Sequence, residues 1–101
     1  MKQIRQGDVL LVEVKDTKGK EVSLPGDIIL MHGEATGHAH RIKEPIGKAV
    51  VLDANAERYL RVLQDVTLRH EEHSPIVLKE GKYQQVFQVE EEGEEVRRVT
   101  D

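Results

Sequence analysis

Histidine is the residue type whose placement in this chain points most directly to chemistry. All five histidines fall between positions 32 and 73, and the rest of the sequence has none. A neutral imidazole is the ligand form for zinc, iron, nickel, copper or manganese. Because the chain has no cysteine, disulfides, thiolate zinc sites and a cysteine nucleophile are excluded. A metal site in this chain would therefore use nitrogen and oxygen ligands.

The phase of the histidines along expected strands predicts that they meet. Side chains alternate between the two faces of a strand. His38 and His40 share one face with an isoleucine. The opposite face carries Ala39, Arg41 and Lys43, and is expected to meet water. His70 continues an apolar row in residues 66–70, and His73 follows within reach of the same place. Histidines from separate strands are thus predicted to point inward together.

We predict one divalent transition-metal ion (zinc, iron, nickel or manganese) bound by His38, His40, His70 and His73. Two ligands at positions i and i+2 can hold an ion from one strand, and a second element can supply the others. An open coordination position would permit Lewis-acid or water-activation chemistry, although the residues name no reaction and no catalytic side chain. The competing interpretation is that these histidines are hydrogen-bonded core residues. His32 is interpreted as a loop residue.

Four carboxylates and two glycines lie close to the histidines in the sequence. Glu34, Glu44, Glu71 and Glu72 are the acids nearest to them. One of these could be a ligand, a hydrogen-bond partner of a ligand or a general base, and the sequence does not choose among these roles. Gly33 and Gly37 frame a loop ahead of His38. A loop that shapes access to a site and a plain hairpin connection are equally open interpretations.

The elements that must position these residues are short strands. Brief apolar runs broken by turn residues predict about eight strands, in a small antiparallel barrel or sandwich. They are residues 9–14, 28–31, 38–43, 49–52, 59–63, 66–70, 76–78 and 83–89, with 96–99 as a short strand or a frayed helix. Residues 53–63 also fit one short helix, but a turn followed by a strand is preferred. The whole chain, 1–101, is expected to form a single β-domain.

Composition limits the class of protein. Apolar residues make up 38% and aromatic residues 3% of the chain, so the core must consist mostly of valine, leucine and isoleucine. The formal net charge of −4 comes from five glutamates between positions 90 and 95. The nearly neutral remainder disfavours nucleic acid as a partner. With no signal region and no membrane span, a cytoplasmic protein is expected. A chain this short with open strand edges also suits a homo-oligomer.

Two resemblances add to these expectations. The segments Gly33 to His40 (GEATGHAH) and His70 to His73 (HEEH) resemble a family of small bacterial and phage-encoded proteins that has no assigned function. His38-x-His40 followed by Glu44 also resembles the first motif of the cupins, which are small β-barrels that often bind a metal. The cupin resemblance implies a further histidine ligand on a later strand, which would be His70 or His73.

Three hypotheses follow from the sequence. The first is a small β-protein that binds one transition metal through its histidines, either as an enzyme or with a small-molecule ligand. The second is a non-catalytic binding or assembly module, related to phage proteins, in which the histidines are structural. The third is a metal-independent nuclease that uses a histidine pair as acid and base, which the nearly neutral body of the chain disfavours.

Overall fold

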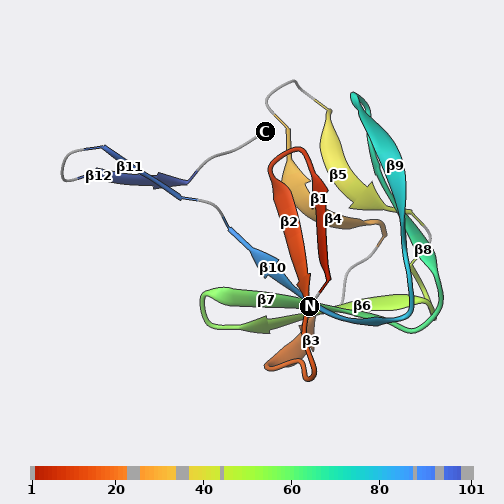
Figure 1. The fold of residues 1–101 in the computed structure, drawn as a ribbon. Helices are drawn as coiled ribbons and strands as arrows, with labels where there is room; N and C mark the ends of the chain where they lie inside the picture. Colours follow the sequence, from red (N-terminus) through yellow and green to blue (C-terminus); the bar gives the residue numbers. More distant parts are fainter. Residues whose placement is uncertain are drawn as a thin grey trace.

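All the regular secondary structure in the residues that the structure describes is β-strand. Figure 1 shows the computed structural model, which describes residues 2–22, 26–33, 37–43 and 45–87 and the backbone of 89–92 and 95–98. The strands are β1 (Gln3–Gln6), β2 (Val9–Glu13), β3 (Lys20–Val22), β4 (Ile28–His32), β5 (Ala39–Ile42), β6 (Ala49–Ala54), β7 (Glu57–Val62), β8 (Val66–His70), β9 (His73–Leu78), β10 (Gly81–Val86), β11 (Val89–Glu92) and β12 (Glu95–Arg98). These residues include no helix long and apolar enough to span a bilayer.

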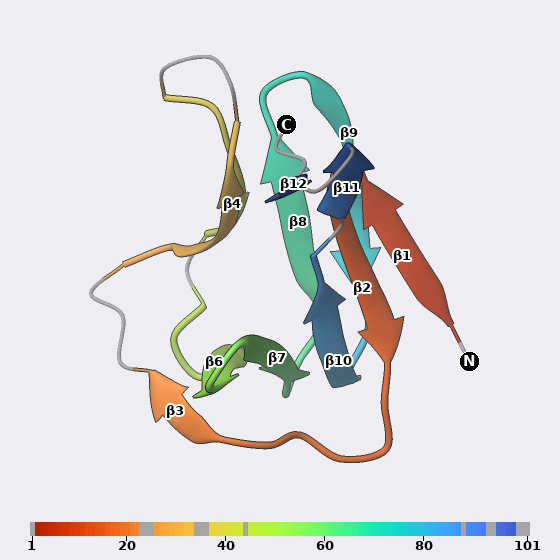
Figure 2. The same ribbon diagram turned by 90° about the vertical axis from the view of Figure 1, so that its left-hand side faces the viewer.

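Ten of the strands form two antiparallel sheets. One sheet has six strands in the order β1-β2-β10-β7-β6-β3, and the other has four in the order β4-β5-β8-β9. In Figure 2, β3, β6 and β7 lie below β4 and β8. β11 and β12 pair only with each other. No ladder joins the two larger sheets in the part of the chain described here, so the all-β prediction is confirmed as a sandwich rather than a closed barrel.

The core between the sheets is aliphatic, as the composition predicts. The fully buried aliphatic residues, each 0% exposed, are Val9, Leu11 and Leu60 of the six-stranded sheet and Ile42, Leu68 and Leu78 of the four-stranded sheet. Tyr83 is the large aromatic side chain among them, at 1% exposed. Along β8 the buried positions alternate with outward Thr67 and Arg69, so the predicted inward face of that strand is confirmed.

The segment between positions 53 and 63, for which a helix and a turn followed by a strand were both considered, lies in the β6–β7 hairpin. Ala54 is paired with Glu57, which leaves a two-residue connection. Asn55 in that connection has a φ of 58°, a left-handed conformation that asparagine tolerates better than most residues. The helix alternative is therefore wrong, and the turn followed by a strand is confirmed. Leu63 falls just beyond β7 and is 48% exposed.

Two strands were missed because their sequences are polar. β1 presents Ile4 and Gln6 inward, and an inward glutamine cannot be recognised from a pattern of apolar residues. β3 is a three-residue strand in which Lys20 and Glu21 are charged, so it contains no apolar run. At the other end of the chain, residues 83–89 do not form one strand, since β10 stops at Val86 and β11 starts at Val89. Residues 96–98 lie in the strand β12 rather than a helix, and Val99 lies outside the described residues.

Candidate metal centre

Three strands of the four-stranded sheet carry one histidine each to a common place. His40 lies in β5, His70 ends β8 and His73 begins β9. The ring centroids are 4.2 Å apart for His40 and His70, 4.7 Å for His70 and His73, and 5.6 Å for His40 and His73. His40 is 0% and His70 9% exposed, while His73 is half-buried. We call these three residues the histidine cluster.

An irregularity in β9 turns His73 toward the cluster. Leu68 is paired with Ile76 and His70 with His73, so β9 has one more residue than β8 between these pairs. The additional residue lies at 74–75, where a proline lacks the N–H that a regular ladder needs. If the pairing at Leu68 continued without this bulge, His70 would stand opposite Ser74, and His73 would point to the other face.

Hydrogen bonds fix two of the rings from different sides. Nδ1 of His40 lies 2.8 Å from Oε1 of Gln6, which reaches across from β1 in the other sheet. Nδ1 of His70 accepts the backbone N–H of Glu72 at 3.0 Å. A neutral imidazole has one donor and one acceptor nitrogen, so these partners restrict where each ring carries its proton. Gln6 was not among the predicted site residues, because no spacing rule marks an inward glutamine.

The two acids of the β8–β9 turn have different partners. Oε1 of Glu71 accepts the backbone N–H of Ala39 at 2.9 Å, and Oε2 lies 3.6 Å from an Arg41 guanidinium nitrogen. The pKa of the Glu71 carboxyl is held below its ordinary value. The largest cause is the hydrogen bond from the Ala39 N–H, followed by one from the backbone N–H of Glu71 itself and by the charges of Arg41 and His38. Glu71 is therefore an ionised clamp between the turn and β5. Oε2 of Glu72 lies 3.7 Å from Nδ1 of His38.

The predicted four-histidine set is divided in the structure. One ligand atom each from His40, His70 and His73 lie within 4.8 Å of one another, and His38 instead forms a second such group with His70 and Glu71. The His38 ring stands edge-on to that of His70, with centroids 5.8 Å apart. His32 is exposed at the end of β4 and belongs to neither group. Glu34 and Glu44 lie outside the described residues.

One residue of β5 departs from the predicted faces. Ala39 was expected to meet water but is 1% exposed. Arg41, which shares its face, donates from its guanidinium back to the Gly37 carbonyl at 3.0 Å. The arginine side chain therefore runs over Ala39 and shields it, an example of a long charged side chain covering apolar surface with its stem.

Gly33, which follows β4 in the β4–β5 hairpin, lies close to the site. The Gly33 N–H donates to the His38 carbonyl at 2.8 Å, which closes the β4–β5 hairpin. A Cβ placed on Gly33 would lie 3.1 Å from Nε2 of His70 and 3.0 Å from Cβ of His38. The backbone of residue 33 thus approaches a cluster ring more closely than a larger residue would allow.

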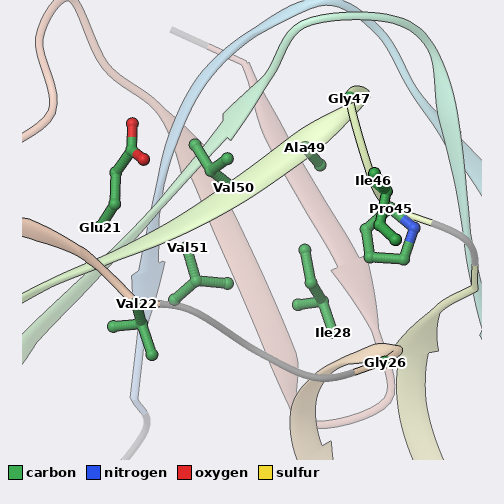
Figure 3. Close-up of a pocket in the computed structure, with 10 residues that line it drawn as sticks. All are labelled: Glu21, Val22, Gly26, Ile28, Pro45, Ile46, Gly47, Ala49, Val50 and Val51. Atoms are coloured by element: carbon green, nitrogen blue, oxygen red, sulfur yellow. The ribbon is translucent and has the colours of Figure 1, made fainter.

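A cavity elsewhere in the sandwich shares no residue with the cluster. It has a volume of about 340 Å³ and lies between β3, β6 and the turn at residues 45–47. Figure 3 shows Val22 and Val51 on one side and Ile28 and Pro45 on the other. Its only ionisable lining residue in the described chain is Glu21. The histidine cluster therefore has the richer set of chemical groups.

Comparison with known proteins assigns the chain to a family without a known activity. A family model described as "Domain of unknown function (DUF8820)" matches residues 5–88. The match covers the three strands that carry the histidine cluster, β5, β8 and β9, and the turn between His70 and His73. No curated protein and no solved structure matches the chain.

Proposed function

Because the chain belongs to the DUF8820 family, whose description names no activity, we propose its function from the histidine cluster: it binds one divalent transition-metal ion through His40, His70 and His73. The observation that carries this proposal is the grouping of their ligand atoms within 4.8 Å. Tetrahedral Zn²⁺ with Zn–N bonds of about 2.0–2.1 Å separates its nitrogens by about 3.4 Å. The rings need to approach by no more than about 1.5 Å to meet this geometry.

The ligand set favours a particular class of ion. Three imidazole nitrogens suit zinc, nickel or iron, whereas magnesium and calcium prefer oxygen ligands. Three protein ligands leave a fourth tetrahedral position for water or a small molecule. Since His73 is half-buried whereas His40 is fully buried, solvent reaches the cluster from the His73 side. An exogenous ligand would therefore enter from that side.

Metal binding requires a change in the hydrogen bonding of His70. Nδ1 of His70 accepts the Glu72 N–H, so the neutral ring carries its proton on Nε2. An ion at Nδ1 of His70 would replace the Glu72 N–H, whereas an ion at Nε2 would require the ring proton to move to Nδ1, which then no longer accepts from Glu72. The Glu72 amide is thus expected to change its environment when the ion binds, and its NMR resonance reports on His70 as a ligand.

Calorimetric titration of chelator-treated protein with ZnCl₂ tests the proposal. We expect binding of about one Zn²⁺ per chain, and loss of that binding in His40→Ala and His73→Ala. His32→Ala is the matched control, because it removes an exposed imidazole outside the cluster and should bind as the wild type does. Equal binding by all four proteins, or no binding by the wild type, would contradict the proposal. The histidines would then be structural, as in the alternative of a non-catalytic module.

A further inference from the structure

Gln6 is a buried side chain whose whole carboxamide is used in contacts between the two sheets. It ends β1, is 3% exposed, and precedes the turn that Gly7 makes with a φ of 57°. Its Nε2 donates to the carbonyls of Leu68 at 3.0 Å and Ser74 at 2.9 Å. An amide nitrogen has two hydrogens, and both are engaged by these carbonyls.

These contacts fix the orientation of the amide. If the carboxamide were turned over, its oxygen would face the Leu68 and Ser74 carbonyls, and two acceptors cannot pair. Oε1 therefore points to His40 and can only accept, so Nδ1 of His40 must donate the 2.8 Å hydrogen bond. The neutral His40 ring then carries its proton on Nδ1, which leaves Nε2 as the unprotonated nitrogen.

We propose that Gln6 is a positioning residue that holds His40 in the Nδ1–H tautomer, and so presents Nε2 of His40 as the ligand atom for the metal. The metal part of this inference rests on the proposed function, whereas the tautomer does not. Metal-ligating histidines commonly donate their second ring N–H to a protein oxygen, which fixes the ring and its tautomer. Here the oxygen belongs to a neutral amide rather than a carboxylate, so no negative charge is added beside the ion.

The same side chain also supports the bulge that brings His73 into the cluster. Ser74 lies in the irregular part of β9, and Leu68 is the last regular partner before it. By donating to both carbonyls, Gln6 satisfies acceptors on β8 and β9 where the ladder is interrupted. One residue of β1 thus links the tautomer of His40 with the backbone course that places His73.

A second buried glutamine provides a matched control. Gln85 in β10 is 2% exposed, and its Nε2 donates to the Leu30 carbonyl at 2.9 Å. Leu30 lies at the register shift of β4, so this contact also joins the six-stranded sheet to an irregular strand of the other sheet. This Nε2 contact is to a backbone carbonyl, not to a histidine. Gln85→Met therefore removes a comparable buried amide without removing a bond to His40.

NMR of the histidine rings in metal-free protein tests the tautomer. The ¹⁵N chemical shifts separate protonated from bare ring nitrogens, and are measured at about pH 8.5, well above the ordinary histidine pKa of about 6.5. We expect His40 of the wild type to be protonated at Nδ1 and bare at Nε2. In Gln6→Met the Nε2–H form should become populated, whereas Gln85→Met should keep the wild-type pattern.

Zinc titration of the same variants tests the consequence. We expect Gln6→Met to bind Zn²⁺ at least roughly tenfold more weakly than Gln85→Met, in line with the effect of removing partners of metal ligands. A proton on Nε2 of wild-type His40 would overturn the inference even if zinc binds, and this measurement stands if Gln6→Met does not fold. The predicted tautomer in a protein that binds no zinc would support the role of Gln6 while refuting the proposed function.

Discussion

His73 stands directly opposite His70 across the β8–β9 turn, in a register that the rest of the two strands does not share. The two-residue connection, Glu71 and Glu72, sets the pairing at the turn. The pairing of Val66 with Leu78 sets the register of the remainder, one residue out of step. The bulge in β9 reconciles the two and keeps both imidazoles on one face. The histidine cluster therefore depends on a backbone irregularity as much as on the positions of the histidines in the sequence.

Gly33→Ala should weaken metal binding by steric pressure on a cluster ring. The added methyl group would lie 3.1 Å from Nε2 of His70, so the ring must move by a few tenths of an ångström. We expect Zn²⁺ affinity, measured by calorimetry, to fall roughly tenfold. Gly26→Ala is the control, because its added Cβ meets no atom within 4 Å. An affinity equal to that of the control would show that His70 needs no close backbone approach.

Leu60→Ala should destabilise the sandwich far more than Leu63→Ala. Leu60 of β7 is 0% exposed, whereas Leu63 just beyond the same strand is 48% exposed. Truncating a buried leucine costs about 2–5 kcal/mol from lost burial and the cavity left behind, and an exposed one costs within about 0.5 kcal/mol. Urea unfolding followed by circular dichroism measures both. Similar losses in the two variants would contradict the assignment of Leu60 to the core.

Asp65→Ala should lower stability near neutral pH but not in acid. Oδ1 of Asp65 accepts the Glu80 N–H at 3.1 Å, and Oδ2 lies 3.2 Å from Nζ of Lys79. The Glu80 N–H, followed by Lys79, holds the pKa of the Asp65 carboxyl below its ordinary value. A depressed folded-state pKa contributes stability above the unfolded pKa of about 3.9, and the contribution is lost as the pH falls through the folded value.

The urea midpoint of Asp65→Ala should thus fall below that of the wild type at about pH 7, and the gap should close toward about pH 2. Asp16→Ala is the control, because it removes the same charge from a side chain that is 87% exposed and 3.8 Å from its partner Lys82. A gap for Asp65→Ala that stays constant over this range would show that its carboxylate charge contributes nothing to folding.

Much of the fold follows from patterns that are local in the sequence. The alternation of Val66, Leu68 and His70 placed the inward face of β8 correctly, because apolar periodicity and strand geometry have the same period. Alternation gave the wrong exposure for Ala39, because the long side chain of Arg41 covers a position that alternation assigns to water. β1 was missed because its buried Gln6 is polar, and burial there depends on partners more than sixty residues away.

The candidate site was likewise predicted only as far as local sequence patterns reach. Clustering and phase pointed to His38, His40, His70 and His73, and the structure brings together ligand atoms of the last three. The separation of His38 from this group is a matter of three-dimensional packing, since it lies on the side of His70 that Glu71 occupies. The Gln6 contact joins strands of different sheets, and no spacing within one segment reports it.

The most direct test of the account is elemental analysis of the purified protein, expressed without a polyhistidine tag. We predict about one zinc, nickel or iron ion per chain, and loss of that ion in His40→Ala while the circular dichroism spectrum of the β-sandwich is retained. A metal-free wild-type protein whose melting temperature does not change when Zn²⁺, Ni²⁺ or Mn²⁺ is added would contradict it, because an ion that binds only the folded state must raise that temperature.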